Sequence, residues 1–587
     1  MRINHMILLI ILLLLCVSVS YADYIDNSNS RIEYAQSISA LRQEPDSAVS
    51  PHVFSKKRGK PNYILVLFKT SGERPDFGEY EPEVLIAGPH NCFTAAYRDE
   101  ETAQVAIEYL RTLSEVIYAE QDGEVYGNSD VEDVIQGASY EQETEYSFHS
   151  SGASKMGFQQ AVNWCKNAGE GSVSVAVIDS GVYPHSLLSS RLQSSGYDYV
   201  DNDADATNDV YGHGTHVAGI VVDCTPELPV YIKPIRVLNA SGKGSIANTT
   251  SAIFEAAEAG CNVINLSLVS KDHSEAMEDA VRYALNCGST VVVSAGNSGD
   301  ITSRYCPVHM EDSGLIVVGA CSGTMDIPIR ASYSNYGPSL DVYAFGDSIR
   351  SCSLSGGFTA QSGTSQAAPH ISALCAIMRR LFPSIGCGQL EKRIKVLAGD
   401  GEVNVPDASL LVPQTMGVST QCVYLPAGTQ IRLLQEAEPR TSYLALAWSC
   451  EDNIVATVDE SGVLSCLSEG VTILHGRGLS KVDISAELHV IDHSSLFHIP
   501  SGVSSIESEA FFGTNAGIVY LPESVESIGD NLFGQTDIKT VIYDGEKMLF
   551  GNIREGEQGF CVVIKKHHEL WKQLNDAGIQ YIIDCIN

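Results

Sequence analysis

The pattern of apolar and polar positions changes several times along the chain, and the first change lies near its start. An apolar run over residues 6–17 follows Arg2 and His5 and gives way to small residues. The run is too short to span a bilayer, and its flanks are typical of a secretory signal peptide. This pattern predicts export, with a signal peptide over residues 1–22 that is cleaved after Ala22.

Residues 62–126 combine strand and helix patterns. A continuous apolar run at 63–68 is typical of a buried strand, residues 101–115 carry apolar side chains at helical spacing, and 116–119 return to a strand pattern. These elements predict a small α+β domain. The polar, acidic stretch 127–151 that follows is typical of a linker.

Between residues 151 and 403 strand patterns alternate with helical ones. The strand patterns cover residues 173–178, 263–268, 291–294 and 315–318, and the helical patterns cover 217–222, 249–259 and 274–286. Near-continuous apolar strands separated by helices predict an α/β domain whose parallel sheet is covered on both faces. In such a sheet the reactive groups collect beyond the carboxyl ends of the strands.

Helical patterns end near residue 412. Short strand patterns within 428–478, with a turn at 459–462, predict a small β-sandwich over 412–494. Beyond it, apolar positions repeat at a fixed interval: Ile499, Val503, Ile506 and Phe511 recur as Leu521, Val525, Ile528 and Phe533. This repeat predicts stacked, leucine-rich-type units over 495–587, closed at the end by residues 568–583.

Composition and charge narrow the classes of function. The 587 residues include 72 Asp and Glu against 37 Lys and Arg, which gives a formal net charge of −35. An acidic surface repels phosphate backbones and anionic lipids, so nucleic-acid binding and polybasic membrane attachment are not expected. After the signal peptide the sequence offers no apolar stretch of membrane-spanning length. We expect a soluble protein that is secreted, or loosely associated with a cell surface.

The cysteines do not suggest a regular framework. The 16 cysteines include no CxxC pair, so the sequence does not predict a structural zinc site. Export permits disulfides, and Cys450 and Cys466 flank a predicted hairpin. They are the pair that we expect to be joined. Other cysteines lie in apolar segments, where the residue acts as a small hydrophobe.

Candidate chemistry lies in four short segments. Asp179 ends a strand, His213 opens a helix in Gly-His-Gly-Thr-His, Asn297 follows Ser-Ala-Gly, and Ser365 follows Ser-Gly-Thr before an alanine-rich helix. Taken singly, each has a structural explanation as a turn former, a helix cap or one of a pair of histidines. Together, in this order, they match the acid, base, amide donor and nucleophile of a hydrolase that acts through a serine.

These segments give the chain its resemblance to the subtilisin-like (subtilase, peptidase S8) serine protease family. The resemblance covers residues 155–398 and the preceding pro-region, and segments 264–268 and 330–338 also match. It implies an α/β catalytic domain at 151–403 that hydrolyses peptide bonds. Further, it implies that this domain is made as a zymogen.

The resemblance also implies roles for individual residues. Asp179, His213 and Ser365 would form the catalytic triad, in which His213 takes the serine proton and Asp179 orients the imidazole. Asn297 and the backbone N–H of Ser365 would form the oxyanion hole. The implied substrate-binding residues are Ser267, Leu268, Val269, Ala295, Gly296, Gly363 and Thr364. Most relatives have glycine where Val269 stands, so narrower upper subsites are expected.

The chemistry requires no cofactor. The stretch 223–234 is short where many relatives carry a calcium-binding loop. Alternating carboxylates just before His213 could still hold a cation: Asp201, Asp203, Asp205 and Asp209. No EF-hand spacing is present, so we favour a solvated acidic loop and leave structural calcium open.

The flanking regions resemble other modules. Residues 62–126 are similar to the inhibitor-type propeptide of the same family, which implies a pro-region at 23–150 that assists folding, covers the cleft and is removed within 126–151. Residues 412–494 resemble a bacterial immunoglobulin-like domain, and 495–587 resemble leucine-rich repeats of bacterial surface proteins. These modules imply a bacterial exported protein that binds a cell surface, matrix or large substrate.

Two other classes of function can be weighed against a protease. A surface adhesin with an inactive subtilisin-like scaffold would be expected to lack a triad residue, whereas this sequence keeps all three together with Asn297. A lipase or esterase of the nucleophile-elbow type would need a Gly-x-Ser-x-Gly turn, which is missing around Ser365. We therefore predict a secreted serine endopeptidase that acts on proteins or peptides through an acyl-enzyme.

Overall fold

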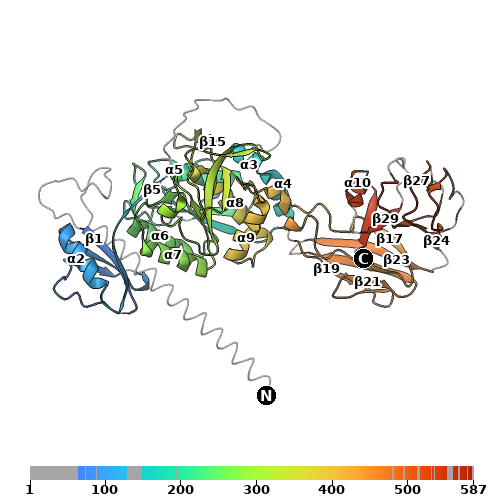
Figure 1. Cartoon of the computed structure of the whole chain (residues 1–587), viewed down its shortest axis with the longest axis horizontal. Coiled ribbons are helices and arrows are strands. Elements are labelled where there is room, and N and C mark those ends of the chain that lie inside the picture. The colour runs from blue at the N-terminus through green and yellow to red at the C-terminus, as the bar shows by residue number, and fades with distance from the viewer. Residues whose placement is uncertain are drawn as a thin grey trace, which may run out of the picture. The chain divides into compact units, whose positions relative to one another are not determined.

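The computed structural model describes most of the chain. The described residues are 64–72, 74–87, 89–127, 148–193, 196–442, 444–478, 482–492, 496–511, 514, 516–530, 532–533, 536–550, 560–565, 569–577 and 579–584. The predicted signal peptide and most of the predicted linker lie outside them. The chain divides into two compact units, Met1–Lys166 with Glu170–Ser409 and Asn167–Gly169 with Leu410–Asn587 (Figure 1).

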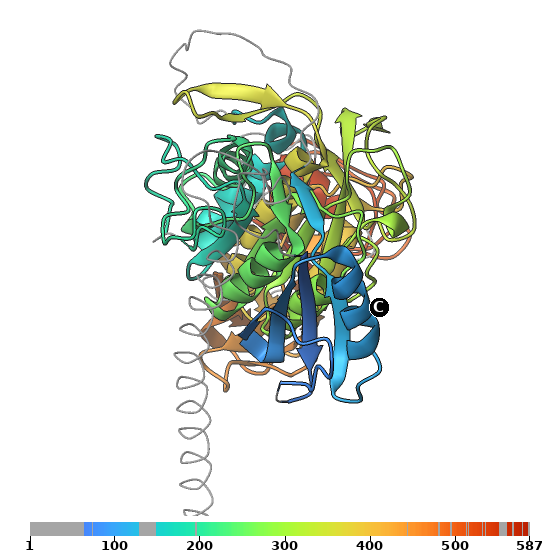
Figure 2. The same ribbon diagram turned by 90° about the vertical axis from the view of Figure 1, so that its left-hand side faces the viewer.

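The first unit begins with a small sheet in the order β2-β3-β1-β4. Its elements are β1 (Ile64–Thr70), β2 (Val84–Ala87), the 3-10 turn η1 (Pro89–Asn91), β3 (Cys92–Tyr97), α2 (Glu100–Leu110) and β4 (Val116–Gln121). One face of the sheet packs on α2 and the other on helices of the following domain (Figure 2). The predicted strands and helix are therefore present, although α2 ends earlier than its pattern predicts.

The larger part of the first unit is built on a sheet in the order β13-β12-β11-β9-β6-β7, with β14 beside β12. Only β13 is antiparallel to its neighbour among these described strands. The strands are β6 (Val173–Asp179), β7 (Val230–Arg236), β9 (Val263–Leu266), β11 (Thr290–Ser294), β12 (Leu315–Gly323), β13 (Pro328–Arg330) and β14 (Val342–Phe345). The parallel sheet predicted from the sequence is confirmed.

Helices cover both faces of this sheet. They are α3 (Ser151–Lys155), α4 (Phe158–Ala168), α5 (His213–Asp223), α6 (Ile246–Glu258), α7 (Glu275–Asn286), α8 (Thr364–Leu381) and α9 (Cys387–Ala398). Helices α6 and α7 share a buried core with Ile178, Ile264 and Val293, while the largely buried α8 packs along the strands from the opposite side (Figure 1). The strands are buried on both faces, which explains why their sequences are almost continuously apolar.

Shorter strands complete the first unit at the edge of the sheet. A small sheet in the order β10-β5-β8 joins β5 (Glu124–Gly127), β8 (Lys243–Ser245) and β10 (Leu268–Val269). The hairpin of β15 (Ile349–Cys352) and β16 (Phe358–Gln361) packs against α5. The 3-10 turns η2 (Thr302–Arg304) and η3 (Ala408–Leu411) lie in connecting segments.

The second unit starts with two small sheets that enclose a common apolar core. One has the order β17-β23-β22-β19 and the other β18-β21-β20. The strands are β17 (Cys422–Pro426), β18 (Gln430–Arg432), β19 (Ala447–Cys450), β20 (Ala456–Val458), β21 (Val463–Cys466), β22 (Gly470–Arg477) and β23 (Asp483–Ile491), with a 3-10 turn η4 (Arg440–Ser442). Two packed sheets agree with the predicted sandwich shape.

The expected pairing of Cys450 with Cys466 is wrong. Both are free thiols, as are the other cysteines of the described residues. Cys450 lies in β19 and Cys466 in β21, and these strands belong to different sheets rather than to one hairpin. The hairpin at the predicted turn instead joins β20 to β21.

The second unit ends in a parallel sheet in the order β24-β26-β28-β29-β30. Its elements are β24 (Leu496–His498), β26 (Ile518–Leu521), β28 (Thr540–Tyr543), β29 (Cys561–Lys565), α10 (Leu570–Asp576) and β30 (Gln580–Asp584), and beside them β25 (Ser505–Ile506) pairs with β27 (Ser527–Ile528). The pairs join equivalent positions of the predicted repeat, such as Leu496 with Ile518. The apolar positions that repeat in the sequence line a shared core.

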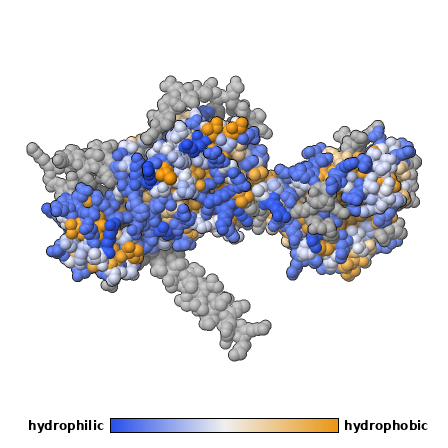
Figure 3. Space-filling model, in the orientation of Figure 1, coloured by the Kyte–Doolittle hydropathy of each residue, from blue (hydrophilic) through white to orange (hydrophobic). Residues whose placement is uncertain are grey.

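The surface fits the acidic composition. Hydrophilic residues predominate on the face of the molecule in Figure 3. Among the helices of the described residues, none combines the length and apolar character needed to cross a membrane.

Candidate active site

Asp179 and His213 meet where a strand of the main sheet ends and a helix begins. Asp179 is the last residue of β6 and His213 is the first of α5. Nδ1 of His213 lies 2.8 Å from Oδ1 and 2.9 Å from Oδ2 of Asp179, and both side chains are buried. A Cβ on Gly214 would lie 2.2 Å from the carbonyl oxygen of Gly181, so only glycine lets the helix start this close to the strand.

The carboxylate of Asp179 favours the charged form of the imidazole. Burial disfavours the charged form of His213, but the charge of Asp179 and its hydrogen bond outweigh this, and the pKa of His213 is raised above its ordinary value. Burial instead lowers the pKa of His216 to about 3 and that of His370 to about 4. The last two histidines are therefore neutral core residues.

Ser365 lies in the first turn of α8, at the position predicted for the nucleophile. Its Oγ donates to the carbonyl oxygen of Ser267 at 3.1 Å, and Oγ of Ser267 donates back to the carbonyl oxygen of Ser365 at 2.9 Å. Nε2 of His213 has no hydrogen-bond partner within the described part of the chain. The serine–histidine hydrogen bond of an assembled triad is therefore not formed in this rotamer.

To form that hydrogen bond, the Ser365 hydroxyl would have to leave the carbonyl oxygen of Ser267. Serine moves readily between staggered rotamers, and catalytic hydrogen bonds often form or shorten only when substrate is bound. Nε2 of His213 is buried and unpartnered among the described residues, so it retains the lone pair that a general base needs. The predicted acid and base thus lie together, while the predicted nucleophile makes a competing hydrogen bond.

Asn297 is fixed through its amide oxygen. Oδ1 accepts from both the backbone N–H and Oγ1 of Thr364, each at 2.9 Å. Because a backbone N–H can only donate, this contact identifies the oxygen and makes Nδ2 the donor end of the amide. Thr364, predicted to bind substrate, therefore holds Asn297. Its Oγ1 also accepts from the N–H of Gly296 at 3.1 Å.

Asn335 supports the same loop and was not singled out as a site residue from the sequence. Its Nδ2 donates to the carbonyl of Ala295 at 2.9 Å, and its Oδ1 accepts from the N–H groups of Ser298 and Asp300. Gly296 has φ 98°, and a Cβ there would lie 2.4 Å from Nδ2 of Asn335. Asn335 lies in segment 330–338, which resembles the protease family. The sequence does not show which loop this segment contacts.

Asp209 organises the turn before His213. Its Oδ1 accepts from the N–H of Gly212 at 2.7 Å, and its Oδ2 accepts from the N–H of Thr215 at 3.0 Å. Burial raises the pKa of Asp209. Asp201 pairs with Arg236. Of the alternating carboxylates named above, none belongs to a metal-ligand cluster found among the described residues.

The predicted substrate-binding strand is already paired. Leu268 and Val269 of β10 lie opposite Gly127 and Tyr126 of β5, and the other edge of β5 pairs with β8. A segment of the predicted pro-region is thus the middle strand of a small antiparallel sheet. Its Val125 is fully buried, in the core that also contains Leu238 and Leu268.

Other residues predicted to bind substrate surround this strand. Ser267 lies between β9 and β10, Ala295 and Gly296 follow β11, and Gly363 directly precedes α8. The missing Cβ of Gly127 would lie 3.7 Å from Nδ1 of His213. The structure therefore brings the predicted site residues together at one edge of the parallel sheet, with β5 across them.

Comparison with known proteins agrees with this arrangement. A model described as the subtilase family matches residues 170–409. The thermophilic serine proteinase of Bacillus sp. (strain AK1) is 39% identical over 224 residues, 37% of this chain and 54% of that protein. The alkaline serine exoprotease A of Vibrio alginolyticus is 36% identical over 245 residues, 41% of this chain and 45% of that protein. The matched segment thus spans about half the length of these two relatives.

A shorter relative is covered almost completely. Subtilisin Savinase of Lederbergia lenta is 33% identical over 249 residues, which make up 41% of this chain and 88% of that protein. The matched region contains the parallel sheet, α5, α8 and the residues that meet at the sheet's edge. The chain therefore belongs to the subtilase family, and its first unit contains a subtilisin-like α/β domain.

Proposed function

We propose that the protein is a secreted serine endopeptidase, synthesised as a zymogen that processes itself. The observation that carries the proposal is the buried Asp179–His213 pair, whose Nε2 has no partner in the described residues, beside a groove that already holds a peptide strand. An extended chain that pairs on both edges is the form in which a protease binds a peptide before cleavage.

The proposed reaction uses the groups described above. Oγ of Ser365 attacks the carbonyl carbon of the scissile peptide while Nε2 of His213 takes its proton, and the imidazolium then gives that proton to the leaving amine. The negative charge that develops on the carbonyl oxygen is stabilised by Nδ2 of Asn297 and the N–H of Ser365. Water, activated by the same imidazole, then hydrolyses the acyl-enzyme and restores the serine.

The contacts of residues 64–127 support their role as an intramolecular inhibitor. Glu120 accepts hydrogen bonds from Oγ of Ser274 at 2.6 Å and from the N–H of Glu275 at 2.9 Å, at the start of α7. A carboxylate is favourable there because a helix N-terminus carries partial positive charge. His90 lies 2.9 Å from Glu258 and stacks near Phe254 of α6.

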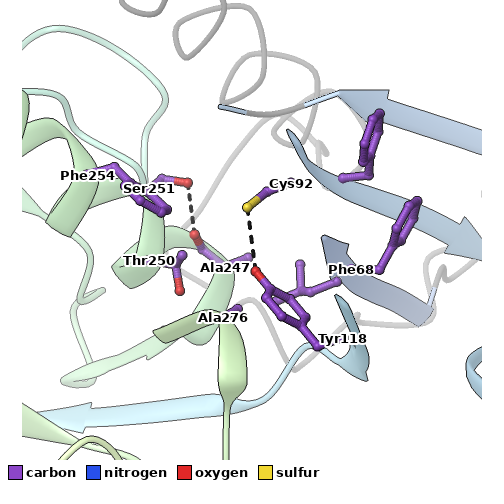
Figure 4. Close-up of a pocket in the computed structure, with 10 residues that line it drawn as sticks. Phe68, Cys92, Tyr118, Ala247, Thr250, Ser251, Phe254 and Ala276 are labelled. Atoms are coloured by element: carbon purple, nitrogen blue, oxygen red, sulfur yellow. Dashed lines mark hydrogen bonds between the residues drawn. The ribbon is translucent and has the colours of Figure 1, made fainter. Parts of the chain in front are cut away.

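Apolar contacts extend this interface. Figure 4 shows Cys92 and Tyr118 on the pro-region side facing residues of α6 and α7 across a small pocket, with Cys92 hydrogen-bonded to Tyr118 at 3.5 Å. Residues from both sides, including Leu67 and Phe254, belong to one buried core. The pro-region is therefore held by a broad surface as well as by the strand in the groove.

The contacts of residues 149 and 150 limit where processing takes place. The N–H groups of His149 and Ser150 donate to the carboxylate of Asp223 at 3.1 and 2.8 Å, and Oγ of Ser150 lies 2.6 Å from Nε2 of His370. These residues are built into the enzyme's core, so we place the cut after Gly127 and before His149. That interval lies mostly outside the described residues.

The second unit would supply the binding modules of the proposed protein. Its two packed sheets suit a bacterial immunoglobulin-like domain, and its parallel strands suit short leucine-rich repeats. We propose that these modules hold the enzyme to a cell surface, matrix or large substrate, while the first unit cleaves protein or peptide chains. The acidic surface keeps the exported protein soluble.

Expression of the full chain tests the proposal. The wild-type protein should convert to a shorter form whose N-terminus lies between residues 128 and 149 and which hydrolyses peptide substrates. The Ser365→Ala variant should remain a full-length, inactive precursor, whereas Ser355→Ala, a change at an exposed serine, should mature normally. Equal maturation of wild type and Ser365→Ala would contradict the proposal.

A further inference from the structure

His273, Glu278 and His309 form a compact group outside the active site, which we call the His–Glu–His cluster. Nε2 of His273 and Nε2 of His309 each lie 3.0 Å from the same oxygen, Oε1 of Glu278. One ligand atom from each residue lies within 4.8 Å of the others. The two imidazole rings are 5.3 Å apart.

The three residues of this cluster come from two separate segments of the chain. His273 directly precedes the N-cap of α7, and Glu278 lies in the first turns of that helix. His309 lies in a different segment, after η2. The two segments that carry the histidines are joined by a bridge between Ser270 and Cys306, in which each N–H donates to the other's carbonyl oxygen at 3.0 Å. The cluster therefore depends on backbone pairing and not on contact between the side chains alone.

Neighbouring groups determine which atoms of the cluster carry lone pairs. Nδ1 of His309 lies 3.0 Å from the carbonyl oxygen of Tyr305, which can only accept, so Nδ1 is the protonated nitrogen. In that tautomer Nε2 presents a lone pair toward Oε1 of Glu278. Oε2 of Glu278 accepts from Arg282 at 3.0 Å, which leaves Oε1 to face the two imidazoles. A cation among these atoms would satisfy all of them.

This arrangement matches the surroundings of a metal ligand. A histidine that binds a metal through one ring nitrogen usually donates its other N–H to a carbonyl or carboxylate, as His309 does. Two imidazoles and a carboxylate suit zinc and its transition-metal neighbours, whereas calcium and magnesium prefer oxygen ligands throughout. The side chain of His273 is 65% exposed, so an ion can enter from solvent.

We propose that the His–Glu–His cluster binds a divalent transition metal ion of the zinc class, with two imidazole nitrogens and one carboxylate oxygen as protein ligands. Water would complete the coordination. The site could not be predicted from the sequence because its ligands come from separated segments and include no CxxC pair. The proposal is independent of peptidase activity, because the cluster shares no residue with the catalytic site.

Metal binding would stabilise one wall of the peptide groove. The Ser270–Cys306 bridge directly follows β10, which pairs with β5. Asp272, next to His273, accepts from the N–H of Glu124 at 3.3 Å. An ion that joins the two histidine-bearing segments resists their separation, so the folded protein should gain stability as the ion concentration rises above the dissociation constant.

Calorimetric titration of the full chain tests the proposal. The Ser365→Ala protein, which should not cleave itself, is stripped with chelator, dialysed and titrated with Zn²⁺ and separately with Ca²⁺. We expect one equivalent of Zn²⁺ to bind and to raise the Tm, and His273→Ala to leave the Ca²⁺ titration unchanged. His273→Ala and Glu278→Gln, each added to Ser365→Ala, should lower the Zn²⁺ affinity at least about tenfold.

A control addresses the other candidate cluster among the described residues, formed by Cys422, Glu487 and His489. Cys422→Ser, in the same background, should leave the first equivalent of Zn²⁺ unchanged. His273→Ala changes an exposed side chain, so its Tm in chelator should equal that of the parent, which checks folding. Absence of Zn²⁺ binding, or binding that His273→Ala and Glu278→Gln leave intact, would overturn the proposal and show that the cluster is an ion pair only.

Discussion

The two hydrogen bonds that orient Asn297 lead to a prediction that separates catalysis from stability. Asn297→Ala removes Nδ2, the proposed donor to the oxyanion, and Oδ1, which accepts from the N–H and Oγ1 of Thr364. Asn297→Asp removes only the donor, because a carboxylate oxygen can still accept both hydrogen bonds. The two variants should therefore share a catalytic defect but differ in stability.

The expected magnitudes follow from these contacts. Loss of one pre-organised donor typically lowers kcat by about 10²–10³-fold, or about 2.7–4 kcal/mol of transition-state stabilisation. Thr364 is fully buried, so Asn297→Ala also leaves its N–H without this acceptor, at a cost of about 1–3 kcal/mol in unfolding free energy. In Asn297→Asp the kcat loss should be at least as large, since a carboxylate repels the developing oxyanion.

Both quantities can be measured on the same preparations. The kcat and KM are obtained with a chromogenic peptide substrate, with enzyme concentration fixed by active-site titration so that slow maturation does not distort the rate. Unfolding free energy is obtained from denaturant titration of the corresponding Ser365→Ala precursors. A kcat for Asn297→Ala within about threefold of wild type, or a defect confined to KM, would refute the assigned role.

Further predictions concern proton transfer, acid stability and the strand in the groove. Asp179→Asn should lower kcat by about 10⁴-fold and move the acidic limb of the pH–rate profile to lower pH, because loss of the carboxylate lowers the pKa of His213; an unmoved limb would contradict this. Burial lowers the pKa of His370 to about 4, so the folded state resists a proton that the unfolded state accepts below about 6.5. In denaturant titrations the unfolding free energy should fall as pH drops from about 6.5 toward 4, and the slope should be smaller by about 1.4 kcal/mol per pH unit in His370→Gln. Gly127→Val should slow maturation at least about tenfold in a gel-based time course, because a Cβ there would lie 2.8 Å from a leucine methyl, whereas Gly72→Ala, in open space, should mature at the wild-type rate.

The sequence predicted those parts of the fold that depend on local pattern. Apolar runs identified β6, β9, β11 and β12, and the segments at Asp179 and His213 were correctly placed at a strand end and a helix start. The repeat beyond Ile499 appears in the structure as parallel strands paired in register. In each case the side chains that pack together follow from a short period along the chain.

The parts that sequence could not provide depend on contacts between distant segments. The pattern of alternating carboxylates did not show that Asp209 accepts hydrogen bonds from the turn that leads into His213. The predicted pairing of Cys450 with Cys466 assumed that both residues lie in one hairpin, whereas their strands belong to two different sheets. Asn335 supports the loop of Asn297 from another segment, and neither partner's local sequence specifies that approach.

The hydrogen-bond partner of the Ser365 hydroxyl also could not be predicted from the sequence. Motif order predicted which residues meet, but not that Oγ of the serine would bond to the carbonyl of Ser267 in place of the imidazole. Such a choice is decided by differences between staggered rotamers that are small compared with the energies that fix the fold.

The central claim is that Ser365 becomes a nucleophile through His213, and covalent labelling tests it most directly. The matured protein is treated with a fluorophosphonate, digested and analysed by mass spectrometry. A single modified serine at position 365 is expected, with labelling abolished in His213→Ala although Ser365 is retained. Labelling at another serine, or undiminished labelling of Ser365 without the imidazole, would contradict the account.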